Sequence, residues 1–310
     1  MYAFMARAWL SRQWTGASAE PSGVPLVIDE QRVWALPRGT ELDVAGMDLR
    51  VNDRGMRGGE VPARLPGEVR LMTLGDSSVF GHGVRETEVF SVIAAEQLSQ
   101  RWQRPVLSLN GAVPGHDSGQ SRMTLRTLSA DLSPDWVVIG SLWSDVYRGR
   151  RQSLPPRVLV VRGVLRELAL YRLLQRLLAP VLSSESIRWI ADAGDISPLS
   201  PDALDAYRRN LRAMARDTSQ LGGCPVFVML PAPMDFDVVP VPEAVAAHRG
   251  VMRAVASETG APLLDGPALL AGNEGWRGLF IDQVHPSATG HARLGMALAA
   301  VLAELGPECS

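Results

Sequence analysis

The chain has 310 residues, of which 46% are hydrophobic and 21% charged, a composition typical of a soluble globular protein. Its 31 basic and 33 acidic residues leave a formal net charge of −2, so charge gives no reason to expect nucleic acid or an anionic membrane as a partner. The first ten residues lack the long apolar core of a signal peptide, and no later stretch reaches the roughly 18 apolar residues of a membrane-spanning helix. We therefore expect a cytoplasmic protein.

Residues 1–66 are rich in Gly, Pro and Trp and show no long periodic pattern. They predict an N-terminal extension with a few short strands that pack on the core. The segment Asn52-Asp53-Arg54-Gly55-Met56-Arg57-Gly58 lies near its end. Asn and Gly favour turns, so Arg57 could pin a turn here. Alternatively, Arg57 could line the substrate site or reach the loop around Ser77.

From Val69 onward, β-rich runs alternate with amphipathic helical stretches. This alternation predicts an α/β domain over residues 67–310, with a parallel sheet covered on both faces by helices. The expected strands are Val69–Leu74, Val106–Leu109, Trp136–Ile139, Val226–Leu230 and Pro262–Leu264. The expected helices cover about 88–103, 118–131, 201–221, 242–259 and 287–305.

The carboxyl ends of parallel strands meet at one edge of the sheet, where ligands bind in such folds. Ser77, Gly115 and Ser144 each follow a predicted strand closely. We therefore expect these three residues to gather at that edge.

One segment, about 147–200, interrupts the alternation and is expected to be a helical insertion. Its part 158–178 carries Arg162, Arg166, Arg172 and Arg176 between leucines, a pattern typical of an amphipathic helix. This helix could pack on the sheet, form a lid or acyl-chain groove over the active site, or lie on a membrane surface.

Two short segments carry candidate chemistry. Gly75-Asp76-Ser77 directly follows the first strand of the sheet, and Asp282-Gln283-Val284-His285-Pro286 lies near the end of the chain. A serine hydroxyl needs a base within hydrogen-bond reach and a third group that orients the base. Asp282 can reach Nδ1 of His285 if the segment turns, which leaves Nε2 for Ser77. The sequence thus predicts a Ser-His-Asp set, with Asp76 holding the serine turn through backbone hydrogen bonds.

These segments resemble the sequence blocks of the SGNH/GDSL hydrolase family, to which residues 69–305 are similar. Gly75-Asp76-Ser77 resembles the first block, which implies that Ser77 is the nucleophile. The stretch from Leu109 to His116 resembles the second block and implies Gly115 as an oxyanion-hole donor. Asp282 and His285 match the fourth block. The resemblance implies a flavodoxin-like three-layer α/β/α sandwich with a mainly parallel five-stranded sheet.

The third block departs from the family pattern, which places an Asn before an Asp. Here the chain reads Ser144-Asp145, so Ser144 occupies the position of the oxyanion-donating Asn. Loss of such a donor can lower kcat by roughly 10²–10³-fold. Ser144 could still donate, the backbone N–H groups of Ser77 and Gly115 or another side chain could suffice, or hydrolysis could be weakened or lost.

Several neighbours of these blocks are candidates for a lesser role. His82, His116 and Trp143 could line the substrate pocket, or they could be loop and packing residues without a role in binding. Asp117 precedes the helix that begins near Ser118 and is expected to cap it.

The resemblance implies a serine esterase or lipase that cleaves a carboxylic ester through an acyl-serine, without metal or organic cofactor. The substrate would be a small-molecule, glycan or lipid acyl ester, and the apolar 158–178 segment favours an acyl chain over a bare acetyl group. An O-acyltransferase that uses the same acyl-serine is the main alternative, and a non-catalytic binding module on this fold is a further one. The sequence leaves the oligomeric state open.

Overall fold

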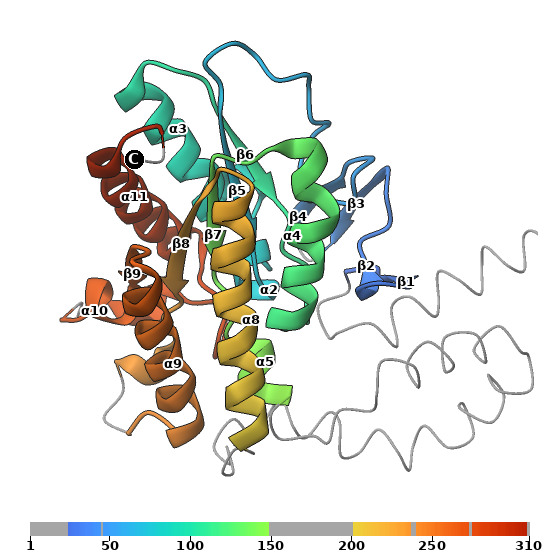
Figure 1. The fold of residues 1–310 in the computed structure, drawn as a ribbon. Coiled ribbons are helices and arrows are strands. Elements are labelled where there is room, and N and C mark those ends of the chain that lie inside the picture. The colour runs from blue at the N-terminus through green and yellow to red at the C-terminus, as the bar shows by residue number, and fades with distance from the viewer. Residues whose placement is uncertain (1–23, 45, 149–200, 237–239, 273–274, 309–310) are drawn as a thin grey trace, which may run out of the picture.

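The computed structural model describes residues 24–44, 46–148, 201–236, 240–272 and 275–308 (Figure 1). From residue 149 onward, the expected insertion and its 158–178 helix lie outside the described residues. Residues 1–23 of the N-terminal extension also lie outside them.

A five-stranded parallel sheet forms the centre of the molecule, with strand order β6-β5-β7-β8-β9. The strands are β5 (Val69–Leu74), β6 (Val106–Asn110), β7 (Trp136–Ile139), β8 (Cys224–Met229) and β9 (Leu263–Asp265). They are the five strands predicted from the sequence, with ends that differ by no more than two residues. The chain enters the sheet at β5, adds β6 on one side, and then returns to add the other three strands on the opposite side.

Five helices cover the two faces of this sheet (Figure 1). Successive side chains of a strand point to opposite faces, so Leu71 packs in one core and Met72 in the other. The first core includes α3 (Phe90–Trp102) and α11 (Ala288–Leu305), and the second includes α4 (Ser118–Leu132), α8 (Pro201–Gln220) and α9 (Glu243–Thr259). The predicted three-layer α/β/α sandwich of flavodoxin-like topology is confirmed.

The connections contain shorter helices. These are α2 (Ser77–Phe80), η1 (Glu86–Glu88), α5 (Trp143–Arg148), η2 (Pro233–Asp235), α10 (Gly266–Leu270) and η3 (Trp276–Leu279). None of the helices within the described ranges has both the length and the apolar character required to cross a membrane.

Helix α11 lies very close to α3. A Cβ atom at Gly295 would stand 2.7 Å from the carbonyl oxygen of Phe90, so only glycine allows the two helices to approach this far. The buried ring of His291 stacks on the ring of Phe90 at 5.8 Å, and its Nδ1 accepts the Phe90 N–H at 3.3 Å. These contacts fix the start of α11, and with it the loop that precedes this helix.

The N-terminal extension contains two antiparallel hairpins. Strand β1 (Val27–Asp29) pairs with β2 (Val33–Ala35), and β3 (Thr40–Val44) pairs with β4 (Met47–Val51). Met47 and Leu49 are fully buried in the core that α3 and α11 share with the sheet. These hairpins and the sheet share one core. The predicted domain boundary at residue 66 stays a prediction.

Candidate active site

A sharp strand-to-helix turn places Ser77 at the carboxyl end of β5, as the first residue of α2. Gly75 permits this turn, because a Cβ atom there would overlap the side chain of Val79. Asp76 caps α2, since its Oδ1 accepts the Ser78 N–H at 3.1 Å. The Ser77 side chain therefore starts at a helix N-terminus, where the helix dipole favours negative charge.

The buried carboxylate of Asp76 also joins this turn to the end of β7. Its Oδ2 accepts the N–H groups of Trp143 at 2.9 Å and Ser144 at 3.2 Å. Burial raises the pKa of Asp76, whereas these donors, the Ser78 N–H and the charge of His285 act in the opposite direction. The expectation that Asp76 holds the serine turn through backbone hydrogen bonds is confirmed.

The loop before α11 turns so that Asp282 faces His285. Oδ2 of Asp282 lies 2.7 Å from Nδ1 of His285, and Oδ1 accepts the N–H groups of Val284 and His285, each at 2.9 Å. Burial tends to raise the pKa of Asp282, but the hydrogen bond and charge of His285 outweigh it and lower this pKa to about 2. Asp282 is therefore an ionised acceptor that fixes the imidazole ring.

The other ring nitrogen of His285 faces the serine. Nε2 of His285 lies 2.8 Å from Oγ of Ser77, although 208 positions separate the two residues in the chain. The next residue, Ser78, donates its hydroxyl to the carbonyl oxygen of Val284 at 2.9 Å. Sequence reasoning missed this second link, which ties α2 to the histidine loop independently of the Ser77 hydroxyl.

The expected oxyanion donors lie on the neighbouring loops. Gly115 follows β6 and adopts a positive φ of 76°, and its loop is attached to the serine turn through the Val113 N–H, which donates to the Gly75 carbonyl at 3.2 Å. The Ser144 N–H is already bound to Asp76, so the hydroxyl is the group through which Ser144 could stabilise an oxyanion. Within the described part of the chain, the Ser77 N–H has no hydrogen-bond partner.

The hairpin β1–β2 supports the Gly115 loop. Trp34 donates its indole N–H to the Pro114 carbonyl at 3.0 Å, and Nε2 of His116 lies 2.9 Å from the Trp34 carbonyl. His116 is fully buried in this contact. Of the two roles that the sequence left open for His116, this burial favours packing, because the ring faces the N-terminal hairpin. Asp117 does cap α4, since Oδ1 accepts the Gln120 N–H at 2.9 Å.

Arg57 reaches the loop that follows Ser77. Its side chain donates to three backbone carbonyls, those of Phe80 at 2.9 Å, Gly81 at 2.6 Å and Val84 at 2.7 Å. Burial lowers the pKa of Arg57 to about 10, although Asp48 and Glu86 act in the opposite direction. With only 3% of the residue exposed, Arg57 holds the 80–84 loop, which agrees with the alternative in which it reaches the loop around Ser77.

Trp143 and His82, the other two candidates for lining the pocket, lie in different places. Trp143 is 2% exposed and packs in the core, which contradicts a pocket wall and favours ordinary packing. The half-buried His82 lies beside the site, because its ring centroid is 4.6 Å from that of His285. Sequence reasoning placed His82 near the pocket but did not find this contact.

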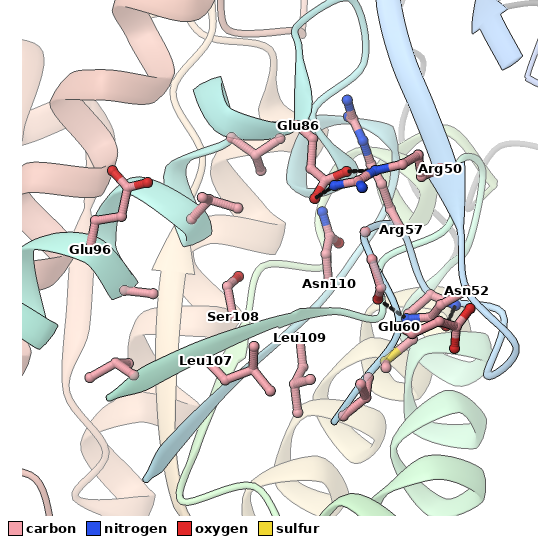
Figure 2. Close-up of a pocket in the computed structure, with 18 of the residues that line it drawn as sticks. Arg50, Asn52, Arg57, Glu60, Glu86, Glu96, Leu107, Ser108, Leu109 and Asn110 are labelled. Atoms are coloured by element: carbon pink, nitrogen blue, oxygen red, sulfur yellow. Dashed lines mark hydrogen bonds and ion pairs between the residues drawn. The ribbon is translucent and has the colours of Figure 1, made fainter. Parts of the chain in front are cut away.

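A cavity of about 530 Å³ lies elsewhere, between α3, β6 and residues 50–61. Figure 2 shows Arg50 paired with Glu86 at one end and Glu96 at the other, above the strand that carries Ser108. Ser77, Asp282 and His285 do not line it. The cavity is therefore separate from the Ser-His-Asp set.

Comparison with known protein families identifies the family of this chain. Residues 73–293, more than two thirds of the chain, match the GDSL-like lipase/acylhydrolase family. No protein with a curated description matches the sequence.

Several solved structures share the fold. An acetyl xylan esterase is 13% identical with a TM-score of 0.53, and the match covers 76% of this chain and 100% of that one. An α/β hydrolase from the metagenome of Lake Arreo, Spain, is 15% identical (TM-score 0.52; 77% and 96% covered). An acetylxylan esterase from Geobacillus stearothermophilus is 17% identical (TM-score 0.50; 75% and 93% covered). At these identities the likeness shows a common fold.

Proposed function

This chain belongs to the GDSL-like lipase/acylhydrolase family of esterases, and on that premise we propose that it hydrolyses a carboxylic ester through an acyl-serine at Ser77. One observation carries the proposal, the continuous set of contacts from Asp282 Oδ2 to His285 Nδ1 at 2.7 Å and from His285 Nε2 to Ser77 Oγ at 2.8 Å. Nucleophile, base and orienting carboxylate are in contact before any substrate binds.

In the first half of the reaction, Oγ of Ser77 attacks the ester carbonyl carbon while Nε2 of His285 takes the hydroxyl proton. Asp282 holds the ring through Nδ1 and stabilises the imidazolium that results. The tetrahedral intermediate collapses when the C–O bond to the alcohol breaks. His285 returns the proton to the departing alcohol oxygen, which leaves the acyl group on Ser77.

In the second half, His285 removes a proton from a water molecule that attacks the acyl carbon. Collapse of the second intermediate releases the carboxylic acid, and the proton on Nε2 returns to Oγ of Ser77. Hydrolysis thus consumes one ester and one water molecule and regenerates the enzyme, with no other reactant required.

The negative charge that develops on the carbonyl oxygen is stabilised by hydrogen-bond donors. The Ser77 N–H at the start of α2 and the Gly115 N–H are the proposed principal donors, with the Ser144 hydroxyl as a weaker third. A hydroxyl is shorter than an Asn side chain and rotates freely, so it holds a donor position less firmly.

The proposed substrate is an ester on a small molecule or a glycan. The Asp282 side chain is 45% exposed and the His285 side chain 14%, so an ester on a small molecule or a glycan can approach from solvent. The esterases that share this fold include enzymes named for acetylated xylan, and an acetyl ester of a carbohydrate is one member of this substrate class.

The test is hydrolysis of p-nitrophenyl esters from acetyl to dodecanoyl by the wild type, Ser77→Ala and Ser219→Ala. Ser219 is exposed on α8, which makes it a matched control for loss of a serine hydroxyl. Activity that survives in Ser219→Ala and disappears in Ser77→Ala supports the proposal, and the chain-length optimum gives the size of the acyl site. Equal activity of wild type and Ser77→Ala would overturn it.

A fluorophosphonate that labels serine nucleophiles gives a second measurement. We expect one label per chain, on the peptide that contains Ser77, and none in Ser77→Ala. Labelling at another residue would assign the nucleophile elsewhere.

A further inference from the structure

A second imidazole lies against the proposed catalytic base. The ring centroids of His82 and His285 are 4.6 Å apart, with the ring planes tilted by 58°. This separation lies within the range in which two aromatic rings are in direct contact. The contact joins the loop after α2 to the loop before α11.

The backbone around His82 is tightly held. The N–H of His82 donates to the Ser77 carbonyl at 3.0 Å. His82 stands between Gly81 (φ 86°) and Gly83 (φ 78°), and both glycines have a positive φ that other residues rarely adopt. Arg57 binds the carbonyls of Gly81 and Val84, on either side of His82. A Cβ atom at Gly83 would stand 2.6 Å from the side chain of Ile281, so this loop packs directly on the histidine loop.

Burial and the nearby positive charges keep the His82 ring neutral. Burial lowers the pKa of His82 to about 4, and the positive charges of His285 and Arg57 act in the same direction, while Asp282 opposes them. Nδ1 of His82 is enclosed and has no hydrogen-bond partner among the described residues. Near neutral pH, only one of the two rings gains a proton during the proposed reaction.

From this geometry we propose that His82 is a positioning residue for the base: its ring confines His285 so that Nε2 stays directed at Ser77. The contact also excludes water from one side of the His285 ring, and it places no second positive charge beside the imidazolium. The role of the contact in catalysis rests on the proposed function, whereas its effect on the orientation of His285 does not.

The experiment compares His82→Ala, His82→Phe and His82→Lys with the wild type. We expect His82→Ala to lower kcat about tenfold at unchanged KM, and His82→Phe, which keeps a ring at this position, to restore most of that loss. His82→Lys adds a cation that disfavours imidazolium formation. It should lower kcat further and move the acidic limb of the pH–rate profile to lower pH.

A second readout needs no substrate. The proton between His285 Nδ1 and Asp282 should give a low-field NMR resonance in the resting enzyme. This resonance should broaden in His82→Ala and stay sharp in His82→Phe, at unchanged melting temperature. Because this signal does not depend on turnover, it tests the positioning role even if Ser77→Ala retains activity and the proposed function fails.

Two results would overturn the inference. The first is a His82→Ala variant with the kcat and the low-field resonance of the wild type. The second is a His82→Phe variant as slow as His82→Ala with a raised KM, which would mean that the nitrogens of His82 bind substrate.

Discussion

The backbone N–H of Ser144 donates a hydrogen bond of 3.2 Å to Oδ2 of Asp76. This contact links Ser144, the residue expected at the position of the family Asn, to the acid of the Gly-Asp-Ser turn. It removes the backbone of Ser144 from the set of oxyanion donors. It also fixes the position of the Ser144 Cα relative to Ser77. A longer side chain introduced at position 144 would therefore extend from this same backbone position.

Ser144→Ala should therefore lower kcat by about tenfold, less than the roughly 10²–10³-fold loss that follows removal of a well-placed oxyanion donor. Ser144→Asn should raise kcat above the wild-type value, because the longer amide can reach where the hydroxyl does not. Steady-state kinetics on one p-nitrophenyl ester measures both effects. A Ser144→Asn variant slower than Ser144→Ala would show that an amide at this position blocks the site.

Arg57→Lys should destabilise the protein by at least about 2 kcal/mol, because the single ammonium nitrogen cannot occupy both Nη positions from which Arg57 binds the Phe80, Gly81 and Val84 carbonyls, so buried acceptors are left unpaired. We also expect a lower kcat, since the loop next to Ser77 loosens. Arg50→Lys is the control: the Arg50 side chain is 53% exposed, and its ion pair with Glu86 lies at the surface. The control should change the free energy of unfolding by less than about 0.5 kcal/mol. Equal effects of the two substitutions in urea unfolding would contradict the role of Arg57.

Gly75→Ala should be inactive or unfolded, because the new Cβ would overlap Val79 on the helix that begins with Ser77. Gly250→Ala is a matched substitution in α9, where a Cβ would meet no atom within 4 Å. It should stabilise the protein by about 0.5–1 kcal/mol through the higher helix propensity of alanine. Thermal unfolding and esterase assays of both variants measure the contrast. A fully active Gly75→Ala would mean that the serine turn adjusts more easily than its packing indicates.

His291 should make the fold sensitive to acid. Burial lowers the pKa of His291 to about 3, with the charges of Arg57 and His285 acting in the same direction, so this ring stays neutral in the folded protein. The unfolded chain binds the proton near pH 6.5, so the stability that depends on a neutral His291 is complete above that pH and is lost as pH falls toward 3. His291→Asn lacks this titration.

Between about pH 6.5 and pH 5, the wild type should lose about 1.6 kcal/mol more stability than His291→Asn, because the slope rises from half of the roughly 1.4 kcal/mol per pH unit at the unfolded pKa toward that full value as pH falls. Urea unfolding at a series of pH values gives the two curves. Parallel curves would show that His291 accepts a proton inside the fold.

The sequence predicted the sheet well, because each strand of this parallel sheet is a short apolar run between amphipathic helices. It also predicted that Ser77 would lie at the carboxyl edge of the sheet. The predicted contact between Asp282 and His285 required only a local turn. For Arg57 the sequence offered contact with the loop around Ser77 as one alternative, but it could not identify the carbonyls that Arg57 binds. The contact between His82 and His285 joins positions 203 residues apart and depends on side-chain direction, so it could not be predicted.

The same limit explains why the sequence left the roles of His116 and Trp143 open. Both residues lie next to sequence blocks of the family, but closeness in sequence does not say which way a side chain points. His116 points to the Trp34 carbonyl, and Trp143 points into the core. Only the packed hairpin β1–β2 and the packed layer of helices determine these directions.

The close docking of α11 on α3 has a consequence for the order of events during protein synthesis. Helix α11 follows every strand of the sheet in the chain, so it leaves the ribosome after Ser77, Gly115 and Ser144 have already done so. The close approach of Gly295 to Phe90 helps to fix the loop that carries Asp282 and His285. A growing chain can therefore assemble its sheet and place Ser77 before His285 is positioned, and the contact between these two residues is completed as α11 docks.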